Sequence, residues 1–219
     1  MLDAIGPYEV LRNLPDVTIQ LVAKEPGDIR ADSHFVQLKV DCSTDEVRKA
    51  DVLLIPGSTI AFVREMKDPK VLRWIREINE TTRKTVTVCT GSLILAAAGL
   101  LKGKKATSHW KPLPLLEQYG AIPTRERIVE QGKFITSAGV SAGIDMGLYL
   151  AQQLRGEAAA KAAQLAIEYD PQPMFRAGDY QTASPTVIRS ATQRLIRDAL
   201  KDFSLREIVK HHRTLLKIM

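Results

Sequence analysis

The sequence predicts an α/β protein with a mainly parallel sheet and helices on both faces. Two observations lead to this class. Predicted strands alternate along the chain with predicted helices. The strands are recognised by β-branched residues or by alternating apolar and polar residues. The strand at 51–56 is a short apolar run and the strand at 85–89 also reads as buried, which is typical of parallel strands covered on both faces. The 219 residues suit one main domain with an appendage.

The first half of the chain supplies most of the predicted parallel strands. These strands are expected at 17–23, 34–41, 51–56 and 85–89. A helix is predicted from Asp68 to Asn79, because Pro69 suits the first helical position. The strand at 85–89 is followed at once by a helix at 91–101. A strand that turns directly into a helix places its last residue at the carboxyl edge of the sheet, where ligands of such folds bind.

The second half of the chain contains fewer strands and more helices. We expect a short strand at 106–109, a helix at 112–119 ended by Gly120, and a hairpin of 127–130 and 133–137. Further helices are expected at 141–155 and 157–169. Two amphipathic helices follow at about 186–201 and 205–217. Ser141 and Ser204 are candidate N-caps. Asp170-Pro171-Gln172-Pro173 ends the Ala-rich helix.

The composition is that of an ordinary globular protein, with 45% hydrophobic and 26% charged residues. Two cysteines, Cys42 and Cys89, do not make a disulfide framework and favour a reducing compartment. No apolar run of about 18 residues and no signal peptide is evident, so we expect a cytoplasmic protein without a membrane span.

The net charge of +6 is concentrated near the C-terminus, where residues 189–219 hold eight Lys/Arg against three Asp/Glu. A solvated helix face explains this charge without any partner, whereas binding to nucleic acid is the alternative.

The segment Val88-Cys89-Thr90-Gly91-Ser92 is the strongest chemical signal. Small residues after Cys89 permit a tight strand-to-helix turn, and such turns hold nucleophiles in strained backbone positions. The thiol would face free N–H groups at the start of the following helix, so the pattern predicts a lowered pKa and a reactive thiolate. The alternative is an inert buried cysteine, because free cysteine is often buried. We interpret Cys42 as structural, because no helix N-terminus follows it.

Six segments together resemble a known superfamily. They are Asp3-Ala-Ile-Gly-Pro-Tyr-Glu-Val-Leu11, Ile55-Pro-Gly57, Val88-Cys-Thr-Gly-Ser92, Ala106-Thr-Ser-His-Trp110, Ser137-Ala-Gly-Val-Ser-Ala-Gly-Ile-Asp145 and Ile167-Glu-Tyr-Asp-Pro-Gln-Pro173. In this order they are similar to the ThiJ/PfpI superfamily of class I glutamine amidotransferase-like proteins. The resemblance is to the branch that contains isonitrile hydratases and the sensor halves of AraC-type regulators, and it covers about residues 1–180.

The resemblance implies a flavodoxin-like fold, a homodimer, a small-molecule substrate and no metal or organic cofactor. It implies hydration of an isonitrile to an N-substituted formamide through a cysteine thioimidate. Cys89 would be the nucleophile, Asp3 the general acid and base, and Thr90 a hydrogen-bonding partner of the developing charge. Ser58, through its N–H after Gly57, would belong to the same polarising pocket.

Other polar residues of these segments have simpler interpretations. His109 is expected to be a hydrogen-bonded pocket or dimer-contact residue rather than a base, because Thr90 stands where some relatives have histidine. Asp145 and Ser141 are expected to support a helix, and Glu9 to be structural. Trp110 is expected either to line the pocket or to pack in an interface. Four scattered histidines do not indicate a zinc site.

The sequence differs from the family pattern in three ways. A central strand normally precedes the segment that contains Asp3, so either the protein starts upstream of Met1 or a sheet edge is open and Asp3 lies near a frayed end. Gly57-Ser58 replaces a common Gly-Gly. Residues 181–219 form a basic amphipathic helical extension after the α/β domain at 1–180.

A second class of function is a ligand-sensing domain without turnover, as in AraC-type regulators. The segment 203–210 faintly resembles the opening of their DNA-binding region, but no recognition helix follows it. A glyoxalase- or deglycase-like protein is a third class, which Asp3 disfavours because those proteins usually pair the thiol with a glutamate.

Overall fold

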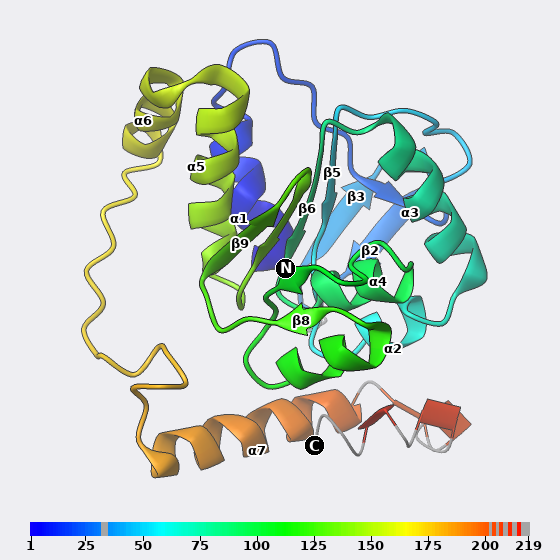
Figure 1. Cartoon of the computed structure of the whole chain (residues 1–219), viewed down its shortest axis with the longest axis vertical. Coiled ribbons are helices and arrows are strands. Elements are labelled where there is room, and N and C mark those ends of the chain that lie inside the picture. Colours follow the sequence, from blue (N-terminus) through cyan, green and yellow to red (C-terminus); the bar gives the residue numbers. More distant parts are fainter. Residues whose placement is uncertain (32–34, 202, 205, 208–209, 212–213, 216–219) are drawn as a thin grey trace.

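The computed structural model describes residues 1–31, 35–201, 203–204, 206–207, 210–211 and 214–215. Its central sheet has four strands in the order β5-β6-β10-β9 (Figure 1). These strands are β5 (Val52–Ile55), β6 (Lys84–Val88), β10 (Phe134–Ser137) and β9 (Ile128–Gln131). Strands β5, β6 and β10 are parallel, and β9 pairs antiparallel with β10 as the predicted hairpin. The expected mainly parallel α/β class is therefore confirmed.

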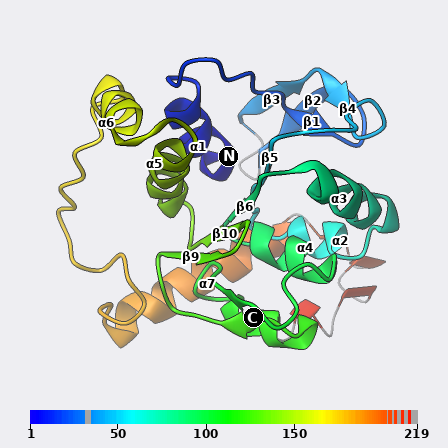
Figure 2. The same cartoon turned by 45° about the horizontal axis from the view of Figure 1, so that its top comes forward.

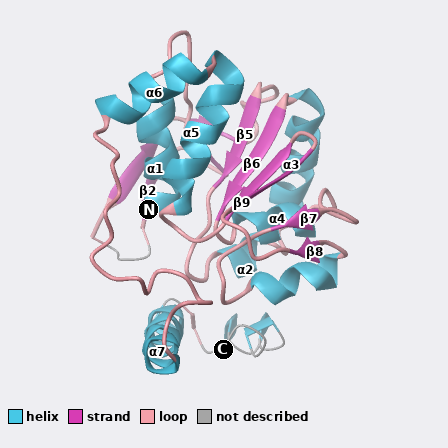
Figure 3. Cartoon of the chain, turned by 60° about the vertical axis from the view of Figure 1, so that its left-hand side comes forward, coloured by secondary structure: helices cyan, strands magenta, loops and turns pink. Residues whose placement is uncertain are grey.

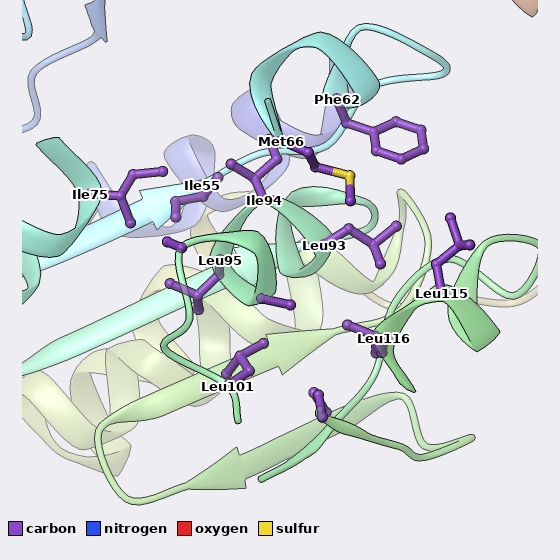
Figure 4. Packing of buried hydrophobic residues seen from close by; sticks show 14 of the residues in the cluster. Ile55, Phe62, Met66, Ile75, Leu93, Ile94, Leu95, Leu101, Leu115 and Leu116 are labelled. Atoms are coloured by element: carbon purple, nitrogen blue, oxygen red, sulfur yellow. The ribbon is translucent and has the colours of Figure 1, made fainter. Parts of the chain in front are cut away.

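Helices cover both faces of this sheet (Figure 3). One layer consists of α1 (Leu2–Leu11), α5 (Ala142–Arg155) and α6 (Glu157–Ala166). The other consists of α2 (Phe62–Glu65), α3 (Pro69–Thr81), α4 (Gly91–Ala97) and the 3₁₀ helix η1 (Leu113–Tyr119). Alternate strand residues point into the two layers, as the pleat requires: Leu53 and Ile55 join one core, and Val86 and Val88 the other. Figure 4 shows how Phe62, Leu93 and Leu116 pack in the first core.

Short strands make up three further small sheets. They are β1 (Val22–Ala23) with β4 (Cys42–Ser43), β2 (Gly27–Arg30) with β3 (Gln37–Val40), and β7 (Lys105–Ala106) with β8 (Ile122–Pro123). Figure 2 shows the first two pairs beside the edge of the central sheet formed by β5. Within the described residues β5 pairs with β6 only, so its other edge carries no strand.

Several predicted boundaries are wrong. Residues 17–21 are not a strand, because only Val22–Ala23 finds a partner strand. The helix predicted at 91–101 ends at Ala97, before Gly99 with a φ of +84°. The segment 112–119 is a 3₁₀ rather than an α-helix, although Gly120 ends it in the left-handed conformation as expected. Of the predicted strand at 106–109 only Ala106 is extended, and it belongs to β7.

Most of the other helices agree with expectation. Asp68 caps α3 by accepting hydrogen bonds from the N–H groups of Lys70 and Val71. Ser141 stands at the start of α5 but makes no side-chain cap hydrogen bond. The helix α7 (Pro185–Lys201) follows a long exposed connection after α6 and crosses beneath the body of the molecule (Figure 1). The helix expected at 205–217 lies partly outside the described residues. No helix among the described residues is long and apolar enough to cross a bilayer.

Candidate active site

Cys89 occupies a strained turn between β6 and α4. It is one residue beyond the strand, where the prediction had made it the last strand residue. Its φ of +57° is unusual for a residue with a side chain and marks stored backbone strain. Gly91 is required here, since a Cβ at this position would lie 2.1 Å from the carbonyl oxygen of Ile55. The predicted elbow is therefore present.

Hydrogen bonds on both sides hold the backbone of Cys89. Its N–H lies 3.1 Å from the carbonyl oxygens of both Ser137 and Ala138. Its own carbonyl oxygen accepts from the hydroxyl of Ser92 at 3.1 Å and of Ser108 at 3.0 Å, and from the Ser92 N–H at 3.5 Å. These bonds compensate the strain of the turn.

Asp3 reaches the thiol from the first turn of α1. Its side chain is buried, with 5% of the residue exposed, and its Oδ2 accepts the N–H of Gly57 at 3.2 Å. Asp3 does not lie on a frayed end, which one of the two alternatives left open by the sequence implied, because α1 packs along α5. A Cβ on Gly57 would lie 2.6 Å from Thr90 Oγ1 and 2.8 Å from Asp3 Oδ2. Glycine at position 57 thus lets Asp3 and Thr90 approach the same loop.

Thr90 and Ser58 are joined by two reciprocal hydrogen bonds. The N–H of Ser58 donates to Thr90 Oγ1 at 2.9 Å, and the Thr90 hydroxyl donates to the Ser58 carbonyl oxygen at 2.9 Å. The Ser58 N–H, which the sequence assigned to polarising the substrate, is already engaged. The Thr90 hydroxyl therefore braces the loop after β5 against the elbow.

The pKa of the Cys89 thiol is raised, which contradicts the predicted lowered pKa. Burial of the thiol is the main cause, and the negative charge of Asp3 acts in the same direction. The backbone N–H groups of Val140 and Thr90 lie against the sulfur and lower the pKa, but they do not outweigh burial and Asp3. Helix α4 does supply an N–H, as predicted. The burial of Cys89, which the sequence offered only as the alternative, is the observed state, with 5% of the residue exposed.

His109 is half-buried beside this site and is neutral. Burial lowers its pKa to about 4. The N–H of Lys111 donates to its Nδ1 at 3.3 Å, so the ring proton belongs on Nε2. Its ring packs against Trp110, with 5.5 Å between the ring centroids. The expected role as a pocket residue fits this geometry.

A cavity of about 230 Å³ opens next to Cys89. Every predicted site residue lines it: Asp3, Gly57, Ser58, Cys89, Thr90 and His109. Sequence reasoning missed several further lining residues. They include Val140 after β10, Ile60 and Phe62 in and before α2, Lys111 after β7, and a set of apolar side chains from the C-terminal segment. Val140 has a φ of +32° and belongs to one of the six quoted segments, which was the available signal.

The remaining polar residues of the six segments are structural. Asp145 pairs with Arg127 and accepts the Tyr169 hydroxyl at 2.9 Å, so it ties two of the quoted segments together, as expected of a supporting residue. Glu9 forms an exposed ion pair with Arg12. Trp110 stacks on Tyr180, with 5.1 Å between the ring centroids.

Two further features concern cysteine and metal chemistry. Cys42 is half-buried in β4 and is not among the cavity residues. Within the part of the chain that the structure describes, no three His, Cys, Asp or Glu side chains gather as metal ligands would.

The fold and the site define an α/β protein with a cysteine at a nucleophile elbow and a carboxylic acid beside it. The family model described as "DJ-1/PfpI family" matches residues 1–153, and the chain belongs to this family.

Individual relatives agree with this assignment. The chain is 42% identical over 193 residues to an isonitrile hydratase from Pseudomonas putida, an alignment that covers 88% of this chain and 84% of that protein. It superposes on a crystal structure of a ThiJ/PfpI family protein from Pseudomonas syringae with a TM-score of 0.84 at 38% identity, covering 91% and 82% of the two chains. The HTH-type transcriptional regulator CdhR of Pseudomonas aeruginosa is 30% identical over 156 residues, but only 43% of that regulator is covered. These findings confirm the family resemblance.

Proposed function

We propose that the protein is an isonitrile hydratase-like enzyme, which adds water to an isonitrile to give an N-substituted formamide. One observation carries this proposal: Asp3 and Cys89, which are far apart in sequence, are buried together against one cavity. The 42% identity to an isonitrile hydratase over most of both chains supports the substrate class. Neither a metal nor an organic cofactor is needed for the steps that follow.

The raised pKa of Cys89 makes a neutral thiol the starting species, and the carboxylate of Asp3 is its proton acceptor. As Sγ bonds to the terminal isonitrile carbon, the thiol proton passes through Asp3 to that same carbon and gives the thioimidate R–N=CH–S. The N–H groups of Thr90 and Val140, which lie against the sulfur, stabilise negative charge that develops on it.

Water then completes the reaction. Asp3 takes a proton from water as the water oxygen bonds to the thioimidate carbon, and it returns that proton to the nitrogen. The resulting R–NH–CH(OH)–S intermediate loses its C–S bond. The sulfur regains a proton from the hydroxyl group, and R–NH–CHO leaves. Atoms and protons balance, since the net change is the addition of one water.

The two cysteines provide a matched test of this mechanism. We expect Cys89→Ala to abolish formamide production from benzyl isonitrile, measured by chromatography, because no other group in the pocket can form the thioimidate. Cys42→Ala should retain activity, because Cys42 is not among the cavity residues. Circular dichroism would check that both variants fold. Undiminished turnover by Cys89→Ala would refute the covalent route, and no hydration by the wild type would refute the proposed enzyme.

A further inference from the structure

The cavity beside Cys89 has two chemically different sides. The catalytic side carries the carboxyl of Asp3, the thiol and the imidazole of His109. A second part of the lining comes from the end of α7 and the residues after it. We call this set the C-terminal wall; it consists of Leu195, Ile196, Ala199, Leu200, Phe203 and Leu215. All six side chains are apolar, although residues 189–219 are strongly basic.

The C-terminal wall is anchored to α2, which itself lines the cavity through Phe62. Arg64 of α2 forms an ion pair with Glu207 at 2.6 Å, and its guanidinium lies 4.7 Å from the ring centroid of Phe203. Ser204 and Glu207 form a reciprocal capping box, which confirms Ser204 as the predicted cap. Phe203 is only 6% exposed and belongs to the main core.

Helix α7 lies on the body without being absorbed into the core. Its half-buried positions are Ile188, Thr192, Leu195, Ile196, Asp198 and Ala199, and all of these except Asp198 fall on one helical face. None of its residues is fully buried. The opposite face carries Arg194 and Arg197 in solvent. The apolar face therefore keeps free surface toward the cavity, and the basic face needs no nucleic-acid partner to explain it.

We propose that the C-terminal wall selects the substrate by binding its non-reacting substituent. This inference rests on the proposed function, because the isonitrile carbon must meet Sγ while the rest of the molecule extends toward α7. An apolar substituent gains by leaving water against this wall, whereas a charged one would be desolvated against its apolar side chains. The enzyme should accordingly prefer bulky apolar isonitriles over small ones, through residues outside the catalytic side.

The test measures selectivity without requiring turnover. Cys89 is alkylated with iodoacetamide and with N-benzyliodoacetamide, and the modified peptide is quantified by mass spectrometry. We expect the wild type to react about tenfold faster with the benzyl probe, as one buried ring would allow. Ala199→Phe should fill the space and remove this preference. Ala191→Phe makes the same change at an exposed position of the same helix, and the preference should remain.

A truncation provides a second route if Ala199→Phe fails to fold. Leu195→Ala removes apolar surface from the wall and should reduce the benzyl preference, whereas Leu165→Ala, at an exposed position of α6, should not. Equal rates with both probes in the wild type, or a preference that survives in Ala199→Phe, would refute the proposal that the C-terminal wall selects the substrate. Because alkylation needs no isonitrile, these outcomes are separate from the failure of hydration.

The same variants then connect the wall to catalysis. For benzyl isonitrile, Ala199→Phe should raise KM by about tenfold with a smaller effect on kcat, because the lost contact is remote from the reacting carbon. Methyl isonitrile should be affected by less than about twofold, since it does not reach the wall. An equal loss for both substrates would contradict a selecting role.

Discussion

At Cys89, two sets of interactions act on one sulfur atom. The N–H groups of Val140 and Thr90 favour a thiolate, whereas burial and the carboxylate of Asp3 favour a thiol. The second set prevails, so the pKa of the thiol is raised. In the proposed reaction, the thiol proton therefore passes to Asp3 as the nucleophile forms. A neutral thiol in a buried pocket is also protected from oxidation, which proceeds through the thiolate.

Asp3→Asn provides a prediction in which reactivity and catalysis move in opposite directions. Removing the negative charge should lower the pKa of Cys89, so alkylation by iodoacetamide at pH 7.5 should become faster than in the wild type. Hydration should fall by about 10²- to 10⁴-fold, the usual contribution of a general acid–base. The measurements are the pH profile of alkylation and kcat with benzyl isonitrile. An unchanged pH profile of alkylation would show that Asp3 does not act on the sulfur.

Close packing of α1 on α5 brings Asp3 to the site. A Cβ on Gly143 would lie 3.3 Å from Pro7 Cδ, and one on Gly147 would lie 3.2 Å from Pro7 Cα. These glycines let the two helices approach, and α1 then carries Asp3 to the loop after β5. The position of Asp3 in the site therefore depends on small residues of a different helix.

Gly147→Val tests this dependence at the level of the helix pair. The added side chain should push α1 away and destabilise the fold by about 1–3 kcal/mol, the usual cost of overpacking. Displacement of Asp3 should also lower kcat, and the pKa of Cys89 should fall as the charge withdraws. Urea denaturation, hydration kinetics and alkylation profiles measure the three effects. Gly178→Val is the control, because a Cβ there meets open space. Destabilisation with an unchanged kcat would argue against positioning by the helix pair.

On the scale of the whole molecule, the C-terminal segment is held by contacts that respond to pH. His211 is 4% exposed, and its Nδ1 lies 3.0 Å from Lys67 Nζ, a geometry that suits a neutral ring. Burial lowers the pKa of His211, and the charges of Lys67, Lys210 and Arg64 act in the same direction, whereas Glu207 opposes them. The segment therefore docks best with His211 uncharged.

Acidification should weaken this docking. Because the pKa of His211 is lowered when docked, the undocked chain binds more protons below the ordinary value of about 6.5. Stability is thus complete above that pH and is lost as the pH falls toward the lowered value. We expect the urea midpoint of the wild type to fall more between pH 7.5 and 5.0 than that of His211→Gln. Equal falls would contradict a contribution from His211.

The homodimer and the boundary between residues 1–180 and 181–219 stay predictions. The structure does make the second unit part of the site, because α7 and Phe203 line the same cavity as Cys89. Residues 181–219 were separated from the α/β domain by their composition, yet they share a cavity with it.

Local signals in the sequence were sufficient for the parallel strands β5 and β6, the capped helix α3 and the elbow at Cys89. Each depends on neighbouring residues: apolar runs, Asp68 before Pro69, and small residues after the cysteine. Of the strand predicted at 17–23 only Val22 and Ala23 formed one, since a strand needs a partner and the sequence does not say where that partner lies. The sequence likewise did not distinguish the 3₁₀ geometry of η1 from an α-helix.

The sequence by itself determined the fold class, the family and the identity of the residues around Cys89. Only the tertiary structure decided the direction of the thiol pKa, the engagement of the Ser58 N–H with Thr90, and the closure of the pocket by the C-terminal wall. The physical reason is that burial and charge proximity are sums over groups distant in sequence. A motif specifies which groups are present, but the electrostatics and shape of the pocket arise only when helices and loops from both ends of the chain meet.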